Sequence, residues 1–128
     1  MILDASALLA YLQQEQGCLL VEEILPIAFI STVNWCEVVQ KLRARQIDDE
    51  EIRKNLEILG LQWISFNLKH SKKAGELWEV TMPFGLSLGD RACLATGLIE
   101  NMPVITADQV WQKLPLSLDV QLIRAVAK

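Results

Sequence analysis

Cysteine and histidine are scarce in this sequence, and their scarcity excludes several kinds of site. The 128 residues include three cysteines, at positions 18, 36 and 93, and no C-x-x-C pair. An odd number of widely spaced cysteines does not favour a disulfide framework or a zinc knuckle. It fits reduced thiols, so we expect a cytoplasmic protein. The one histidine, His70, has no serine or cysteine partner nearby in the sequence, which leaves a histidine-based catalytic triad without support.

Long apolar runs and an excess of positive charge are also absent. The first residues, MILDASALLAYLQQ, have no basic segment, and Asp4 interrupts their apolar run, so we expect no signal peptide. The stretch ILPIAFI is too short to span a bilayer, and we expect no membrane association. With 12 basic and 16 acidic residues the net charge is −4, unlike the basic domains typical of nucleic-acid binding. Bound divalent cations can offset acidic groups locally, so a nucleic-acid substrate is not excluded.

The sequence does contain the pattern of one α/β domain. Its length predicts a single domain over residues 1–128, and 52% hydrophobic residues suffice for a buried core. Short apolar segments alternate with segments of helical periodicity. We predict strands at 1–3, 27–31, 61–66, 104–106 and 120–125, and helices at 5–14, 18–25, 32–45, 49–59, 67–80 and 88–100. This alternation predicts a three-layer α/β/α sandwich with a central parallel sheet.

Four acidic residues differ from most of the others, which lie on predicted helix surfaces or first turns. Asp4 directly follows the first predicted strand, and Glu37 lies in the second turn of the helix after the second strand. Asp90 opens the helix that leads into strand 104–106, and Asp108 follows that strand by two residues. Strand carboxyl ends and helix amino ends share one edge of such a sheet, so we expect the four carboxylates to gather there. Mg²⁺ or Mn²⁺ prefers oxygen ligands and would relieve their mutual repulsion.

Two of these acids also have an ordinary explanation as capping residues. Asp4 is placed to cap the helix that begins at Ala5, and Ser6 would then be a capping hydroxyl. Asp108 is placed to cap the turn after its strand.

The other two acids likewise have local explanations. Glu37 stands three residues after Asn34 and four before Lys41, where a solvated Glu–Lys pair is typical. Asp90 belongs to a Ser87-x-x-Asp90 pattern close to a capping box. None of these local explanations accounts for four acids at one edge of the sheet.

Four blocks follow one another along the chain: ILDASALLAY, TVNWCEVVQKL, GLSLGDRACLATG and VITADQVWQKL, with VQLIR near the end. Together they resemble the PIN-domain ribonucleases, specifically the VapC-type toxins of toxin–antitoxin pairs. No single block is specific, but their order and spacing extend over essentially the whole chain.

The resemblance implies an α/β/α fold and Mg²⁺- or Mn²⁺-dependent endonucleolytic cleavage of RNA. Family members are usually homodimers, neutralised by a cognate antitoxin whose tail covers the acidic groove. The family's acidic and hydroxyl positions match Asp4, Glu37, Asp90, Asp108, Ser6 and Thr106. Many relatives carry a further Asp or Asn two residues after the last acid, where this chain has Val110. The resemblance therefore leaves open whether one or two metal ions bind.

We assign roles to these residues as a hypothesis. The main metal ligands, direct or through water, would be Asp4, Asp90 and Asp108, and Glu37 would hold or orient a metal-bound water. Ser6 and Thr106 would support the ligands or contact the phosphate. Arg91 is either structural or at the rim of the groove. RNA contacts are expected from the basic residues of KLRAR (41–45) and KHSKK (69–73), each of which taken singly also fits a solvated helix face.

Two other functions compete with this interpretation. A non-catalytic PIN-like interaction module is disfavoured by the four intact acids. A Mg²⁺-dependent phosphoryl-transfer domain would need a lysine close after a late strand, but the residues after VIT are ADQV, and Lys113 comes farther on.

Overall fold

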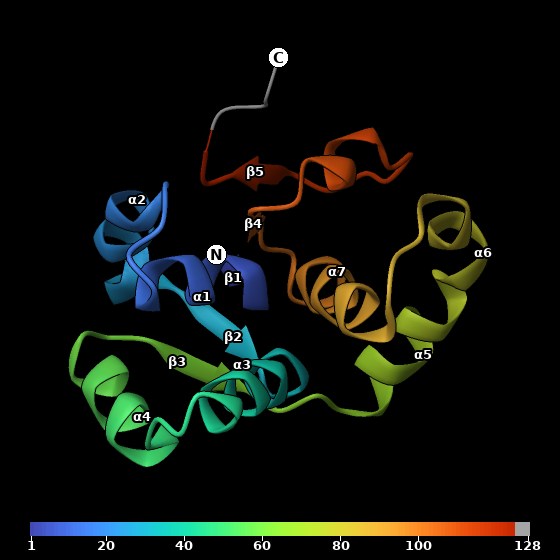
Figure 1. Ribbon diagram of the computed structural model, residues 1–128. Coiled ribbons are helices and arrows are strands. Elements are labelled where there is room, and N and C mark those ends of the chain that lie inside the picture. Colours follow the sequence, from blue (N-terminus) through green and yellow to red (C-terminus); the bar gives the residue numbers. More distant parts are fainter. Residues whose placement is uncertain (125–128) are drawn as a thin grey trace.

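The computed structural model describes residues 1–124, in which a five-stranded sheet lies between two layers of helices (Figure 1). The strands are β1 (Ile2–Leu3), β2 (Phe29–Ser31), β3 (Gln62–Ile64), β4 (Val104–Thr106) and β5 (Val120–Leu122). The α-helices are α1 (Ala5–Leu12), α2 (Cys18–Ile24), α3 (Thr32–Ala44), α4 (Asp49–Ile58), α5 (Leu68–Glu76), α6 (Trp78–Thr81) and α7 (Leu88–Glu100). Three 3₁₀ turns are η1 (Leu25–Ile27), η2 (Met82–Phe84) and η3 (Gln109–Lys113).

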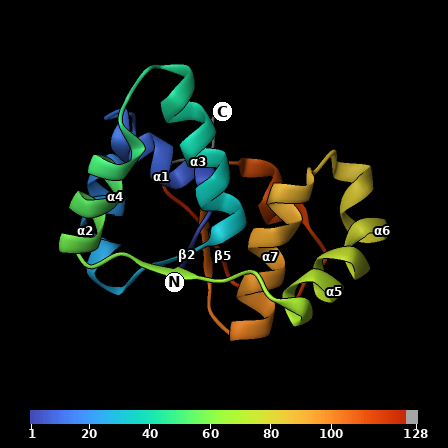
Figure 2. The same ribbon diagram turned by 90° about the horizontal axis from the view of Figure 1, so that it is seen from below.

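All neighbouring strands are parallel, in the order β3-β2-β1-β4-β5. Figure 2 shows α1, α2, α3 and α4 grouped apart from α5, α6 and α7, with strands between the two groups. This arrangement confirms the predicted three-layer α/β/α sandwich with a central parallel sheet. Among residues 1–124, no helix is both long and apolar enough to cross a membrane.

The two layers exist because successive strand residues point to opposite faces of the sheet. Leu3 and Ile105 are buried with the side chains of α1 to α4, whereas Ile2 and Val104 are buried with those of α5 and α7. Strands buried on both faces read as continuous apolar runs, which is why IL and VIT lack polar alternation.

Four predicted segments need correction. Strand 27–31 begins only at Phe29, because Ile27 ends the η1 turn and the Ala28 N–H donates to Leu25 O at 3.2 Å within that turn. Strand 61–66 contracts to the three residues of β3 that pair with β2. The single helix predicted at 67–80 is two helices, α5 and α6, which meet at Leu77. Of the predicted strand 120–125, residues 120–122 are strand, and residue 125 lies outside the described residues.

His70 is a structural residue. Its side chain is fully buried, and its Nδ1 accepts a hydrogen bond from the Asn67 backbone N–H at 3.3 Å. The ring proton therefore sits on Nε2, which donates to Glu100 Oε1 at 2.8 Å. This pair ties α5 to α7 and leaves the histidine unavailable for chemistry.

Candidate functional site

The candidate site lies at the carboxyl ends of β1 and β4, where the strand order reverses. The chain builds β2 and β3 on one side of β1 and then crosses to build β4 and β5 on the other. Open parallel sheets bind ligands at such switch points, outside the strand carboxyl ends. Asp4 follows β1 directly, and its backbone N–H still pairs with Ile105 O of β4 at 2.8 Å. Thr106 ends β4 beside it.

Asp4 anchors a buried network of hydroxyl groups. Its carboxylate Oδ2 accepts hydrogen bonds from Ser6 Oγ at 2.6 Å and from Thr106 Oγ1 at 3.0 Å. Ser6 Oγ in turn accepts from the Ala107 backbone N–H at 3.0 Å. Asp4 occupies the N-cap position of α1 but makes no side-chain capping bond, so the capping explanation fails for it. The structure instead places both hydroxyls around this carboxylate.

Burial makes Asp4 a weak acid in the protein without metal. The side chain is 4% exposed, and burial raises its pKa from 3.8 to about 7. The hydrogen bonds from Ser6 and Thr106 lower the pKa, while the negative charges of Asp90 and Glu37 raise it further. Those charges act on Asp4 because all three carboxylates lie near one another.

The charges of the same three carboxylates also act on the buried thiol of Cys93. Burial raises the pKa of this thiol well above its ordinary value, and the charges of Asp4, Asp90 and Glu37 act in the same direction. Cys93 lies on α7 and is fully buried. These three acids come from the end of β1, from α3 and from α7, which are far apart in the sequence.

Glu37 lies on α3, and its side chain packs against α7. Its Oε1 accepts a hydrogen bond from Asn34 Nδ2 at 2.8 Å, and Asn34 also donates to Gly89 O at 2.9 Å. Burial raises the pKa of Glu37, the hydrogen bond from Asn34 lowers it, and the charge of Asp90 raises it. Its hydrogen-bond partner is thus Asn34, and no salt bridge joins it to Lys41 among the described residues.

Asp90 combines a capping role with its place in the acidic group. Its Oδ2 accepts from the Ser87 backbone N–H at 2.9 Å, and its own N–H donates to Ser87 Oγ at 3.2 Å. The capping box is therefore real, and it occupies one carboxylate oxygen while Asp90 still acts on Asp4 and Glu37. The neighbouring Arg91 donates from Nη1 to Leu86 O at 3.0 Å, a structural contact within its own segment.

Asp108 is the one exposed residue among the four predicted acids. Its side chain is exposed, and its Oδ1 caps η3 by accepting from the Val110 backbone N–H at 3.0 Å. Its own N–H donates to Thr106 Oγ1 at 3.1 Å, which links it to the Asp4 network through the backbone. Its charge is not among the causes of the raised Asp4 pKa. The Val110 side chain packs against the core beneath α7.

The chemistry of these groups fits a hydrated divalent cation. Asp4, Glu37 and Asp90 are oxygen donors that repel one another, and no salt bridge offsets their charge among residues 1–124. Within the same residues, no three His, Cys, Asp or Glu side chains form a group that could hold a metal ion by themselves. Mg²⁺ keeps several water ligands and needs only one or two carboxylates, so the donor set suits it without a complete protein cage.

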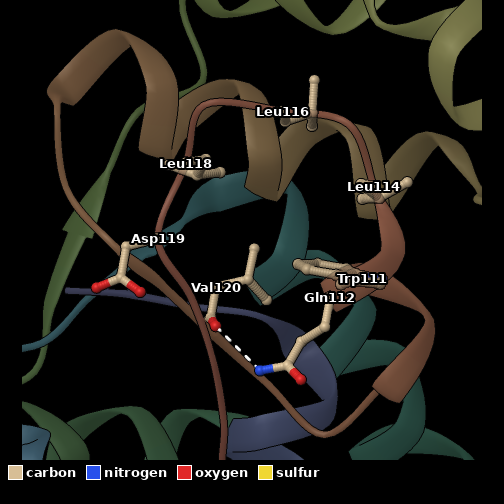
Figure 3. Close-up of a pocket in the computed structure, with 7 residues that line it drawn as sticks. All are labelled: Trp111, Gln112, Leu114, Leu116, Leu118, Asp119 and Val120. Atoms are coloured by element: carbon tan, nitrogen blue, oxygen red, sulfur yellow. Dashed lines mark hydrogen bonds between the residues drawn. The ribbon is translucent and has the colours of Figure 1, made fainter.

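A pocket of about 490 Å³ adjoins the acids. Its mainly apolar lining comprises Thr32, Val33, Cys36, Glu37, Phe66, Leu88 and Gly89. A second cavity of about 330 Å³ lies between η3 and β5, where Gln112 Nε2 donates to Val120 O at 3.4 Å (Figure 3). The second cavity contains none of the four predicted acids, so only the first pocket shares residues with the candidate site.

Sequence reasoning did not assign a role to Asn34 or Gly89, which both contact Glu37. The three-residue spacing of Asn34 and Glu37 on one helix was a signal for the first of them. A glycine inside a predicted helix was a signal for the second, because glycine weakens helices and needs a packing reason. Neither signal identifies the partner helix, which only the folded chain brings into contact.

Comparison with known proteins gives a family and a fold. The PIN domain family model matches residues 1–116. Curated protein sequences give no match. A chain of the toxin-antitoxin complex from Klebsiella pneumoniae is similar to this one, with a TM-score of 0.73, 18% identity and coverage of 98% of each chain.

Two DNA-bound complexes contain similar chains as well. One is VapBC from Salmonella typhimurium, with a TM-score of 0.74, 9% identity and coverage of 96% of this chain and 97% of that chain. The other is VapBC2 from Rickettsia felis, bound to a DNA fragment from their promoter, with a TM-score of 0.69 and 19% identity over 94% and 96% of the chains. At such identities the likeness shows a shared fold.

Proposed function

Because this chain belongs to the PIN-domain family, we propose that it is a metal-dependent endoribonuclease and the toxin of a type II toxin–antitoxin pair. The observation that carries the proposal is the buried carboxylate of Asp4 at the switch point of the sheet, with Glu37 and Asp90 close enough to raise its pKa. Burying one carboxylate close to two others destabilises a fold, and carboxylates with strongly raised pKa values are concentrated at functional sites. The family and the similar chains in VapBC complexes make nuclease chemistry the best account of it.

The proposed metal ion is Mg²⁺ or Mn²⁺, held directly or through water by Asp4, Asp90 and Asp108, with Glu37 beside them. When bound, the ion supplies positive charge that offsets the phosphate and favours ionisation of an attacking water. Ser6 and Thr106 fix the Asp4 carboxylate, so its second oxygen, Oδ1, is oriented without a hydrogen-bond partner of its own among the described residues.

The substrate that we propose is RNA with its scissile phosphate at these carboxylates. The pocket lined by Phe66 and Leu88 shares Glu37 and Gly89 with the site, and it offers room for a neighbouring nucleotide. Of the expected RNA contacts, Arg43 pairs with Asp49 at 3.0 Å and Lys73 with Glu76 at 3.9 Å. The remaining basic residues are exposed and have no salt bridge among the described residues: Lys41, Arg45, Lys69 and Lys72. Lys69 and Lys72 lie on α5, which closely follows Phe66 of the pocket, and are therefore the better candidates.

The proposed partners are a cognate antitoxin and a second copy of the chain. Support for an antitoxin comes from the similar chains, which were solved in toxin–antitoxin complexes. The homodimer rests on the resemblance to VapC-type toxins. Co-expression with any small protein found to be encoded beside this chain, followed by purification on a tag carried by one of them, tests the first partnership.

Cleavage of RNA by the purified protein tests the function. Wild type, Asp90→Asn and the exposed control Asp119→Asn are incubated with total RNA and with structured tRNA and rRNA fragments, in Mn²⁺, Mg²⁺ or EDTA. We expect discrete cuts by wild type and control that disappear in EDTA and in Asp90→Asn. Metal binding without any cut by wild type would instead support the non-catalytic module.

A further inference from the structure

Asn34 is a fully buried polar side chain to which the proposed chemistry gives no role. It lies in the first turn of α3 and is 0% exposed, although asparagine is usually found at protein surfaces. Its Nδ2 donates both hydrogens, one to Glu37 Oε1 at 2.8 Å and one to Gly89 O at 2.9 Å. A carboxylate and a carbonyl can only accept hydrogen bonds, so the orientation of the amide is fixed.

Gly89 contacts the same carboxylate from the other side. It lies in α7 with an ordinary helical backbone, so a positive φ does not explain the glycine. A Cβ atom at this position would come within 3.0 Å of all three atoms of the Glu37 carboxylate group, closer than real Cβ atoms approach other atoms. The absence of a side chain at Gly89 is what allows Glu37 to pack against α7.

The two contacts leave one carboxylate oxygen free. Oε1 of Glu37 is occupied by Asn34, whereas Oε2 has no hydrogen-bond partner among residues 1–124. A glutamate side chain has three rotatable bonds and, on a helix surface, samples many orientations. Here the amide and the close approach to Gly89 restrict it to one place, next to Asp90 and Asp4.

We infer that Asn34 and Gly89 are positioning residues that fix the Glu37 carboxylate in the acidic group, Asn34 by donating a hydrogen bond to Oε1 and Gly89 by leaving space for the group. They act through Glu37 and are not themselves among the proposed metal ligands. The inference rests on the proposed function, because it concerns how that site is held.

A double-mutant cycle tests the role of Asn34. Mn²⁺ affinity is measured by calorimetry, and the RNA cleavage rate by a gel assay, for wild type, Asn34→Ala, Glu37→Gln and the double variant. We expect Asn34→Ala to weaken Mn²⁺ binding and to slow cleavage by about 10- to 100-fold, the usual cost of losing a residue that orients a metal ligand. In the Glu37→Gln background the same substitution should cost less than about threefold, since the group that it positions has been changed.

A second pair of variants tests Gly89 without removing a hydrogen bond. Gly89→Ala should weaken Mn²⁺ binding to a similar extent, because the new methyl group displaces the Glu37 carboxylate. Gly75→Ala is the matched control, since its Cβ would meet no atom within 4 Å on α5. Asn55→Ala, on the exposed face of α4, is the control for Asn34→Ala. Unfolding curves of every variant without metal ensure that affinities are compared for folded protein.

The outcomes separate the two claims. Wild type that binds no Mn²⁺ and cuts no RNA would refute the proposed function, and the positioning role with it. Wild type that does both, with equal losses from Asn34→Ala in the two Glu37 backgrounds, would refute the positioning role alone and make Asn34 a structural link between α3 and α7. Full Mn²⁺ affinity in folded Gly89→Ala would refute the role of Gly89.

Discussion

Replacing Asp4 by asparagine should stabilise the protein without metal at neutral and alkaline pH. In the unfolded chain this carboxyl loses its proton near its ordinary pKa of 3.8, whereas in the folded protein it holds the proton up to about pH 7. Between these values the folded state binds more protons than the unfolded state, so stability falls as the pH rises. Above about pH 7 the penalty is complete, and below about pH 4 it is absent.

The size of the effect follows from the two pKa values. Each tenfold change in proton affinity is worth about 1.4 kcal/mol, so the span from 3.8 to about 7 corresponds to roughly 4 kcal/mol. The asparagine oxygen can still accept from Ser6 and Thr106, but its new Nδ2 group must be buried, which costs about 1–3 kcal/mol. The net gain expected for Asp4→Asn at pH 8 is therefore about 1–3 kcal/mol.

Urea unfolding in EDTA at pH 4, 6 and 8 measures this difference. We expect the stability of wild type relative to Asp4→Asn to decrease steadily from pH 4 to pH 8. Asp119→Asn, at an exposed aspartate, should show no such trend. An Asp4→Asn variant that is no more stable relative to wild type at pH 8 than at pH 4 would refute the argument that burial of a charged Asp4 destabilises the fold.

Four further effects are expected. Mn²⁺ at a hundred times its dissociation constant should raise the unfolding free energy of wild type by about 2.7 kcal/mol but not that of Asp4→Asn, and equal effects would place the ion elsewhere. Asp90→Asn should slow RNA cleavage by about a hundredfold or more. It should cost little stability, because asparagine can still accept the hydrogen bond from the Ser87 N–H. A large drop in the unfolding temperature of Asp90→Asn would favour a purely capping role for Asp90. Ser87→Ala should lower the unfolding free energy by about 1 kcal/mol in urea, and no change would show that the capping bond is weak. Gly75→Ala should raise it by about 0.5–1 kcal/mol, since α5 gains a better helix former without a clash, and a loss would contradict the open space found there.

The fold was predictable because its signals are local. Apolar runs such as VIT and amphipathic helices such as α4 follow from periodicity alone, and their alternation gives a parallel sheet. The break between α5 and α6 at Leu77 was missed, although Gly75, two residues before it, is a local signal that weakens a helix. Nor did the pattern show that Pro26 would belong to a 3₁₀ turn that shortens the next strand.

The site was predictable only in part, because one residue can have two roles and because some contacts form only in the folded chain. Topology brings Asp4, Glu37 and Asp90 together as expected from their places at one edge of the sheet. Asp90 is both a capping residue and a member of the acidic group, so the two explanations from sequence did not exclude each other. The exposed position of Asp108 and the fit of Glu37 against Gly89 depend on contacts that no local pattern encodes.

Locating Mn²⁺ by anomalous X-ray diffraction tests the central claim most directly. Crystals of wild type and of Asp90→Asn are soaked in Mn²⁺, and the anomalous peaks are placed relative to the carboxylates. We predict a peak in wild type that contacts Asp4 and lies among the four acids Asp4, Glu37, Asp90 and Asp108, and that is weakened or absent in Asp90→Asn. A wild-type crystal with Mn²⁺ bound elsewhere, and none at Asp4 under conditions where the protein cuts RNA, would contradict the account.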